Sequence, residues 1–515
     1  MNQRTLMSIA AVPVFLASAV ARAQAPAVPP ADAPPAAAAP MPPPPAPEPP
    51  PPPPPKPASP PSQTAGSVNK FALQVYGFAE LDTWHDNILN AGEGVGNSII
   101  AKPNTQAANN GRWVWTARNS RFGFKVNAPE WEGMKASANL ELDFGGGPAG
   151  GAPGPLGGAT AAPTPYSNSY GNEAAYTTTG VVRMRHAYMK WETPYVDIIA
   201  GQTWDVFGWG VVPFLAAGPE YQGITGQIYH RNPEVRLDHR FVTDAVVVQL
   251  ALAAVRPFQR DSLTPDFEGG IKFELPTWKG VHVVGAGKPG YDSATLGISG
   301  IYRTFKLPQF TLPAGATAAP ATYDYVKKAG YGISGDLFLP LLGGTMEDQS
   351  NAIALTGEAA YTAGIGDFYG GLGSGGLPGA APWVAANAGA MQAVVPYPQN
   401  FDSGVLAWNG TELIPIKWLG LTAGLQYHLP VYDGKLFWIS GNFGMMKLMD
   451  TGSYNLMATN ATVMKSNQWI DGSFFASLGP AAHLAVNYAT YQNTFYDGSK
   501  SARLQRVMVS TYMFF

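Results

Sequence analysis

The stretch from Met134 to Phe144 alternates polar and apolar side chains without a break. One face collects Lys135, Ser137, Asn139, Glu141 and Asp143, and the other collects Ala138, Leu140, Leu142 and Phe144. Successive side chains of a strand point to opposite faces, so this pattern predicts a β-strand with one polar and one apolar side. Soluble strands are usually about 5–6 residues long, whereas a tilted membrane-crossing strand needs about 9–11. The same pattern runs from Phe71 to Asp82, and both stretches are therefore interpreted as membrane-crossing strands.

The chain also ends on a predicted strand. We predict that Phe515, Met513 and Val509 face lipid and that Arg506, Ser510 and Tyr512 face water. Terminal residues usually fray unless something holds them, and a barrel whose last strand pairs with its first would hold them. This ending resembles the last strand of Gram-negative outer-membrane β-barrels, which typically end on an aromatic residue. An ordinary amphipathic edge strand is the alternative.

Composition separates one large membrane barrel from several soluble domains, since 515 residues fit either. Charged residues make up 13% of the chain, against about 25% in soluble proteins, and aromatic residues make up 12%. No apolar run of about 18 residues follows the first segment, which excludes a helical membrane protein. We predict an all-β fold, a transmembrane antiparallel up-and-down barrel of about 16 strands over residues 70–515.

Two segments precede the predicted barrel. Residues 1–23 have the layout of a signal peptide, with Arg4, an apolar run from Leu6 to Val20 and the small-x-small pattern Ala21-Arg22-Ala23. Residues 24–69 are rich in Pro and Ala and are predicted to be a disordered, partly extended tether in the periplasm. A tether that reaches the cell wall is the sharper alternative to a plain spacer.

Short and long predicted connections alternate along the barrel, as expected of tight periplasmic turns and long outer loops. An even number of strands places the start of the first strand and the end of the last strand on the same side of the membrane, in the periplasm. Pro276–Gly280 is one predicted short turn, with a single extended turn from Pro276 to Ala294 as the alternative. Aromatic girdles are predicted from Trp84, Trp113 and Trp115 on the outer side and from Trp131, Trp191 and Trp278 on the periplasmic side.

Charged residues fall on the predicted inner faces of the strands. A lipid-facing Arg or Lys at the membrane midplane costs about 2–4 kcal/mol, so we expect these charges to line a pore. The predicted basic lining is Arg121, Lys125, Arg183, Arg185, Arg236 and Arg240, and the predicted acidic lining is Glu80, Asp82, Glu141, Asp143 and Asp238. Opposed rows would set up a transverse field, and basic rings favour anions. The alternative is that the charges pair across strands and stiffen the wall.

His186 conflicts with this arrangement. Strict alternation that sends Arg183 and Arg185 inward sends His186 toward lipid. A β-bulge or a contact between subunits is therefore expected at this position.

Three motifs carry a resemblance to a known family. Ser120-Arg121-Phe122-Gly123-Phe124, Arg183-Met184-Arg185-His186-Ala187-Tyr188 and Gly201-Gln202-Thr203-Trp204 resemble strands of the DcaP-like outer-membrane porins. The resemblance implies a trimeric, water-filled channel of 16 strands for small anionic solutes such as dicarboxylates, with a basic lumen at Arg121, Arg183 and Arg185. It also implies that the third long loop, Asp205 to Arg231, folds inward as the constriction, for which we propose Asp205, Glu220 and Tyr221. The proline tract departs from family members that begin with a helical coiled-coil segment.

Enzymatic chemistry finds little support in the sequence. Gly285-Ala286-Gly287-Lys288-Pro289-Gly290 is a poor phosphate loop, because Pro289 stands where a hydroxyl residue would bind magnesium. The chain has no cysteine and only scattered histidines, so we expect no metal or other cofactor. A net charge of −3 gives no reason to expect nucleic acid.

The predicted function is therefore a porin for small hydrophilic, anionic solutes in the Gram-negative outer membrane, with both termini periplasmic. Its expected partners are outer-membrane lipid, two further copies of the chain in a homotrimer, and the solutes. Two alternatives stay open: a non-conducting barrel that binds the cell wall through its Pro-rich arm, and an outer-membrane hydrolase with a nucleophile on the barrel rim.

Overall fold

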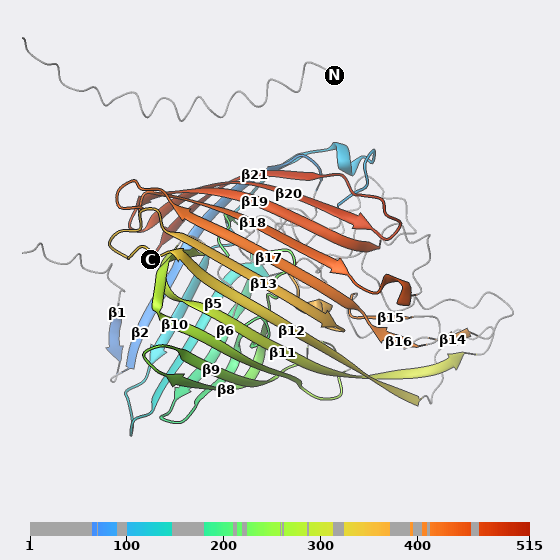
Figure 1. Cartoon of the computed structure of the whole chain (residues 1–515), viewed down its shortest axis with the longest axis horizontal. Coiled ribbons are helices and arrows are strands. Elements are labelled where there is room, and N and C mark those ends of the chain that lie inside the picture. The colour runs from blue at the N-terminus through green and yellow to red at the C-terminus, as the bar shows by residue number, and fades with distance from the viewer. Residues whose placement is uncertain are drawn as a thin grey trace, which may run out of the picture. The chain divides into compact units, whose positions relative to one another are not determined.

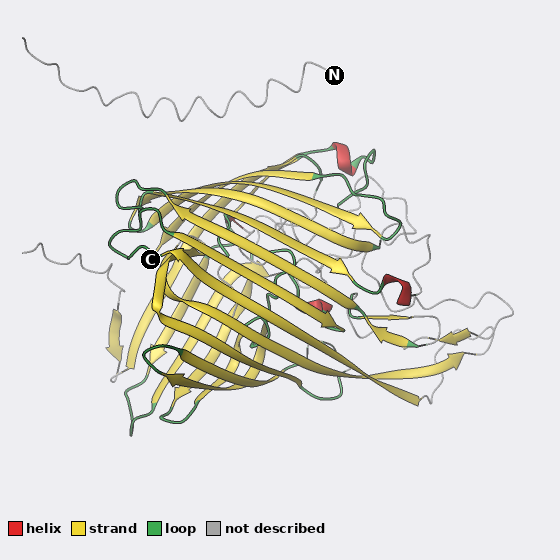
Figure 2. Cartoon of the chain, in the orientation of Figure 1, coloured by secondary structure: helices red, strands yellow, loops and turns green. Residues whose placement is uncertain are grey.

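The computed structural model describes residues 64–68, 71–89, 100–146, 180–209, 214–218, 224–257, 259, 262–285, 288–312, 324–370, 392–394, 404–408, 412–454 and 463–515. The predicted signal peptide and most of the predicted tether lie outside these residues, as do Glu220 and Tyr221. None of the helices in the described ranges is long and apolar enough to cross a membrane. Those helices are the short 3-10 turns Ala107–Asn109, Gly366–Phe368 and Thr451–Ser453, and strands dominate the rest (Figure 2).

The strands of the barrel wall follow one another in the order of the sequence (Figure 1). Residues 392–394 pair instead with the end of the strand that finishes at Leu312, and residues 406–408 and 413–415 form a separate two-stranded sheet. The described strands are named here in chain order. They are β1 (Thr64–Val68), β2 (Phe71–Asp86), β3 (Arg112–Thr116), β4 (Arg121–Asn127), β5 (Lys135–Gly146), β6 (Val181–Glu192), β7 (Asp197–Trp204), β8 (Arg231–Val242), β9 (Val247–Val255), β10 (Asp266–Val284), β11 (Lys288–Leu312), β12 (Asp324–Leu342), β13 (Ile353–Ala363), β14 (Gln392–Val394), β15 (Leu406–Trp408), β16 (Leu413–Pro415), β17 (Lys417–His428), β18 (Phe437–Leu448), β19 (Met464–Gly479), β20 (Ala482–Phe495) and β21 (Leu504–Phe514). Strands β3 and β4 both pair with β2 and form one interrupted wall strand. Strand β1 pairs with the start of β2, so the last residues of the predicted tether belong to the sheet.

The sheet closes on itself through its first and last wall strands. Strand β21 pairs antiparallel with β2, from Phe78 opposite Phe514 to Asp86 opposite Arg506. Each wall strand in the described residues pairs antiparallel with its neighbours in sequence, which gives a closed barrel of 16 strands. The predicted all-β fold is confirmed, and with it the expectation that the aromatic C-terminus is held by closure.

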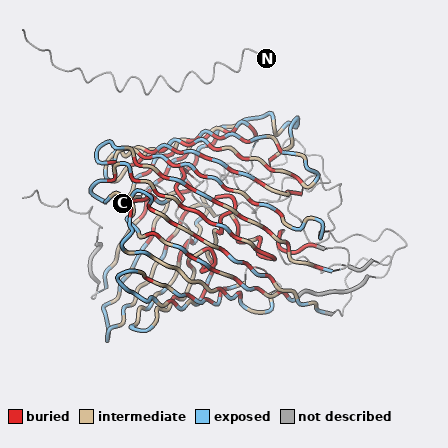
Figure 3. The backbone as a smooth tube through the Cα atoms, viewed as in Figure 1, coloured by how far each residue is buried: buried red, intermediate tan, exposed pale blue. Residues whose placement is uncertain are grey.

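Buried and exposed residues alternate along the wall strands, as the sequence pattern predicted (Figure 3). On β21, Val507 and Met513 are exposed outside, while Arg506, Ser510 and Tyr512 are buried inside. The predicted faces are correct, but these inner residues pack against protein and do not meet water. The prediction that Trp84 belongs to the outer aromatic girdle is wrong. Trp84 lies on the inner face of β2 and is fully buried. The other five predicted girdle tryptophans are exposed, namely Trp113, Trp115, Trp131, Trp191 and Trp278.

The predicted turn at Pro276–Gly280 is wrong. Strand β10 continues to Val284, and the register with β11 shifts between Leu275 and Lys279. Proline lacks a backbone N–H and therefore looks like a turn signal in sequence, but a bulge tolerates it inside a strand. The hairpin turns only beyond Val284, which pairs with Lys288.

Candidate functional site in the barrel interior

Strands β4, β5 and β6 bring three predicted arginines onto two predicted carboxylates. Arg183 binds Asp143 with two hydrogen bonds, of 2.8 Å from Nε and 2.6 Å from Nη2. Arg185 donates to Glu141 at 2.8 Å and to Asp143 at 3.1 Å, and Arg121 lies 3.5 Å from Glu141. The pairing that we considered as an alternative is therefore present for all five groups.

A β-bulge explains how Arg185 and His186 both turn inward. Glu141 lies opposite His186 while Leu142 lies opposite Met184, so Arg185 is the extra residue of β6. Both side chains are buried, and His186 Nδ1 lies 3.1 Å from Thr203 Oγ1. The conflict in the sequence thus marked a real irregularity, and the expected bulge is present at this position.

The remaining predicted strand residues also lie on inner faces. On β8, Arg236 Nε donates to Asp238 at 2.9 Å, and Arg240 donates to Glu274 of β10 at 2.8 Å. Lys125 shares the face of Arg121 and is exposed. Glu80 and Asp82 are buried on β2, where Asn119 donates to Asp82 at 2.8 Å.

In three of these pairs the cation is more exposed than the acid. The exposed fraction of the side chain is 35% for Arg183 and 0% for Asp143. It is 18% for Arg236 and 6% for Asp238, and 49% for Arg240 and 18% for Glu274. On the inner surface of β5–β8 the side chains of Arg183, Arg236 and Arg240 are thus more exposed than the carboxylates that they bind, whereas Arg185 is buried.

The described parts of the third long loop, residues 205–209, 214–218 and 224–230, cross the interior; we call them the crossing segment. The N–H groups of Phe207 and Ile228 donate to Glu268 of β10 and Glu358 of β13, at 2.8 and 2.5 Å. Further along, Gly218 N–H donates to Tyr512 OH of β21 at 2.7 Å. The segment therefore reaches from β10 to the closing strand β21.

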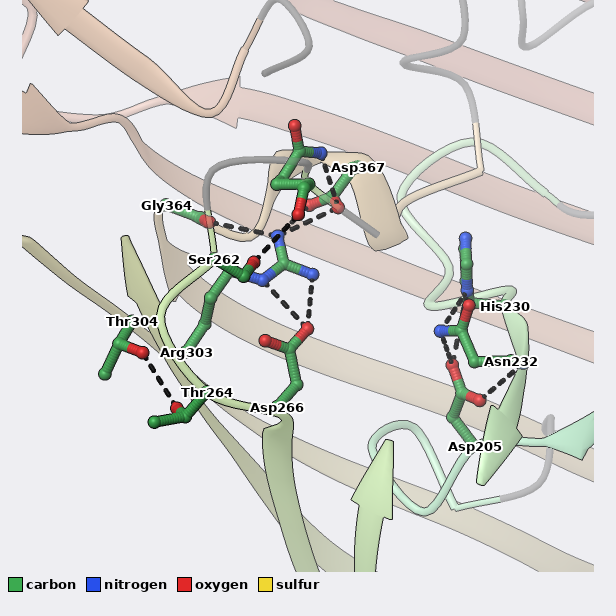
Figure 4. Close-up of polar contacts among 11 residues, drawn as sticks. Asp205, His230, Asn232, Ser262, Thr264, Asp266, Arg303, Thr304, Gly364 and Asp367 are labelled. Atoms are coloured by element: carbon green, nitrogen blue, oxygen red, sulfur yellow. Dashed lines mark hydrogen bonds and ion pairs between the residues drawn. The ribbon is translucent and has the colours of Figure 1, made fainter. Parts of the chain in front are cut away.

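Asp205, which we placed in the constriction, instead fixes the base of the crossing segment. Its carboxylate accepts two hydrogen bonds from Asn232, both of 2.9 Å, and lies 3.3 Å from His230 (Figure 4). The side chain is buried. Glu220 and Tyr221 lie outside the described residues.

The pKa of Tyr229, at the end of the crossing segment, is shifted by the positive charges around it. Burial alone raises the pKa of its phenol, but the Arg185, Arg231 and Arg121 guanidinium groups outweigh burial and lower the pKa to about 8. Arg231 also stacks on the rings of Trp204 and Tyr229. The basic residues therefore act on the same part of the interior.

A second segment inside the barrel, Gly364–Gly370, was not predicted from the sequence. It forms a bridge between Tyr369 and Ile228, and Gly370 N–H donates to Gln227 O at 2.8 Å. Arg303 of β11 anchors it, with bonds of 2.8 Å to Asp367 and of 2.8 and 2.9 Å to Asp266 (Figure 4). The apolar residues that directly follow β13 in sequence were the signal, because a hydrated loop rarely needs them.

Apolar side chains fill the side of the interior near the closing strands. Phe214 and Leu215 of the crossing segment are buried in one cluster with Trp84 of β2, Trp469 of β19 and Met508 of β21. The cluster also includes Val283 of β10. One side of the interior is thus a packed core, and the exposed charges lie on the other.

Comparisons with known proteins agree on the fold. The sequence matches no family model and no curated protein. The structure is similar to the crystal structure of the outer membrane channel DcaP of Acinetobacter baumannii, with a TM-score of 0.56 and 15% identity over 87% of this chain and 99% of that one. Weaker matches include an anion-selective porin from Comamonas acidovorans (TM-score 0.43, 10% identity, 86% and 100% covered) and Pseudomonas putida OprB (TM-score 0.42, 10% identity, 85% and 94% covered). The resemblance to DcaP inferred from three motifs is confirmed at the level of the fold.

Proposed function

We propose that this chain is an outer-membrane porin, a water-filled diffusion channel that favours small hydrophilic anions of the dicarboxylate kind. The observation that supports this proposal is the layering of charge on the inner surface of β4–β8. A solute passing this wall meets exposed guanidinium groups such as that of Arg183, while the acid that holds each one lies covered.

The layering has a simple electrostatic consequence. Paired acids fix the arginines in place and offset the cost of gathering like charges. The covered Asp143 carboxylate holds Arg183 and Arg185 in place, and the three arginines of this cluster outnumber its two carboxylates, Glu141 and Asp143. A basic lining of this kind raises the local concentration of anions and repels cations.

The crossing segment supplies the constriction in this proposal. It covers the acids Glu268 and Glu358, whose oxygens accept its N–H groups, while the side chain of Arg183 on β6 stays 35% exposed. The pore then runs between the crossing segment and the basic wall. Both chain termini lie in the periplasm, and the long loops lie on the outer side of the membrane. Three copies assemble in the membrane.

Electrical recording of the purified full-length protein in a planar lipid bilayer tests the proposal. We expect stepwise conductance and, in a salt gradient, a reversal potential that shows anion preference. A permanently silent protein contradicts the channel, and a protein that then co-sediments with peptidoglycan favours the cell-wall barrel. Conductance with cation preference contradicts the anionic part alone.

A further inference from the structure

The turn end of the β10–β11 hairpin does not continue the barrel wall. Beyond the register shift at Leu275, residues Lys279–Val284 of β10 pair with Lys288–Ser293 of β11, and we call these two strand ends the inner hairpin. Val281 and Val283 are fully buried. A hairpin that simply extended the wall would leave one side of these residues in lipid or water.

Contacts place the inner hairpin inside the barrel. The ring of His282 packs on Phe338 of β12 with centroids 4.6 Å apart. Val283 N–H donates to the side chain of Gln426 on β17 at 2.8 Å, and that side chain donates back to Val283 O at 2.8 Å. Gln426 shares its strand face with Gly424, where an added Cβ would lie 2.8 Å from Phe214 of the crossing segment. Phe338 and Gln426 therefore point inward, and the inner hairpin spans the inner wall between them.

The docking is specific. Strand β13 lies between β12 and β17 in the wall, so the inner hairpin passes over one complete strand. The amide of Gln426 matches both backbone groups of Val283, and Val281 N–H donates to Gly343 O at 2.9 Å. Buried backbone groups must find such partners, so their pairing stabilises the docked position.

The inner hairpin lies at the end of the barrel that holds Phe71 and Phe515, opposite the end from which the crossing segment enters. Its second strand leaves Tyr291 and Asp292 exposed. Packed layers of strands lie about 10 Å apart, so a docked two-stranded hairpin removes a large part of the cross-section of a 16-stranded barrel.

We propose that the inner hairpin is a second narrowing of the channel, separate from the crossing segment, that limits conductance and solute size at the terminal end of the barrel. This proposal rests on the channel function proposed above. Its chemical basis is the docked contact between Val283 and Gln426.

Removal of the inner hairpin tests the proposal. Leu275 pairs with Ala294 just before the bulge, so residues 276–293 are replaced by Asn-Gly, which closes a tight two-residue hairpin. We expect the single-channel conductance to rise roughly 1.5-fold or more, because the narrow section widens. Liposome swelling should show a matching rise in the size of the largest sugar that enters.

A point variant keeps the test decisive if the shortened barrel fails to fold. Gln426→Ala removes both hydrogen bonds to Val283 and should increase conductance or add frequent brief openings to larger levels. The matched control is Gln492→Ala on β20, which loses one hydrogen bond to Ser501 O. Its conductance should equal that of the parent.

The possible failures are distinguishable. If the parent conducts and neither the shortened barrel nor Gln426→Ala differs from it, the second narrowing is refuted and the porin stands. If the parent itself never conducts, the proposed function fails, and this inference fails with it.

Discussion

Two arginine–aspartate pairs on the inner surface have the same bonding and opposite surroundings. Arg183 binds Asp143 on the β5–β6 wall with bonds of 2.8 and 2.6 Å, and Arg506 binds Asp86 on the closing strands with bonds of 2.7 and 2.9 Å. The exposed fraction of the arginine side chain is 35% in the first pair and 0% in the second. Alternation places both pairs on the inner face, but only the first reaches open space.

The cover over each pair explains the difference. The Arg506 guanidinium lies 4.7 Å from the centre of the Trp84 ring, within the apolar cluster that the crossing segment completes. The side chain of Arg183 is 35% exposed, and its guanidinium lies against Gly145, where an added Cβ would come within 2.9 Å of Nη2. The same ion pair can thus stabilise the barrel or attract solutes, and its cover decides which role it has.

Arg506→Met should have the largest effect on stability. The substitution leaves the Asp86 carboxylate buried without its guanidinium, and breaking a buried pair typically costs about 3–5 kcal/mol. Denaturant unfolding of the barrel in detergent micelles measures the loss, and the ion selectivity of the folded fraction should not change.

The double variant Arg506→Met/Asp86→Leu is the control for this prediction. Removing both charges should restore most of the lost stability, because no unpaired carboxylate remains. A single variant that unfolds within about 1 kcal/mol of the parent would contradict the assignment of this pair to the structural core.

Strand parity explains how much of the fold could be predicted. Each inward position such as Arg121, Asp238 or Tyr512 follows from alternation, and the C-terminal aromatic residue sets the register of closure. The bulge at Arg185 was also foreseeable, because His186 could not face lipid at low cost.

The contents of the interior could not be predicted in the same way. Trp84 and Arg506 sit at inward positions like those of Arg183, and no local pattern says that a loop more than a hundred residues away in sequence will cover them. The sequence alone does not distinguish a turn from a bulge at Pro276, because proline, which lacks a backbone N–H, is accepted in both. Strand alternation assigns each side chain to the inner or outer face, whereas contacts with residues distant in sequence decide whether an inner side chain is buried or exposed.

Neutralising the exposed arginines should change selectivity more than stability. In Arg121→Gln/Arg183→Gln the wall of β4–β6 loses two of the three arginine charges that lie beside Glu141 and Asp143, so the anion-to-cation permeability ratio should fall severalfold. Reversal potentials in a salt gradient measure the ratio. Arg183→Lys is the control, since it keeps the positive charge and loses only the bidentate hydrogen bonding to Asp143.

A ratio that stays constant in the double variant would contradict the assignment of the basic wall to the solute path. The porin itself would survive that result, because conductance does not depend on these two charges. Selectivity would then have to come from other inner residues, such as Arg236 and Arg240 on β8.

Arg183→Met should have the smallest effect on stability, and it is the direct counterpart of Arg506→Met. Asp143 keeps its hydrogen bonds from Arg185 Nη1 and from Gly145 N–H, both of 3.1 Å, so its carboxylate is not left alone. Because Arg183 is about one-third exposed, water already offsets much of its attraction to Asp143, and the loss should stay below about 1 kcal/mol. Unfolding of the two variants under identical conditions measures the contrast. A loss for Arg183→Met equal to that of Arg506→Met would mean that cover does not distinguish the pairs, whereas a small loss with reduced anion preference separates the attracting pair from the structural one.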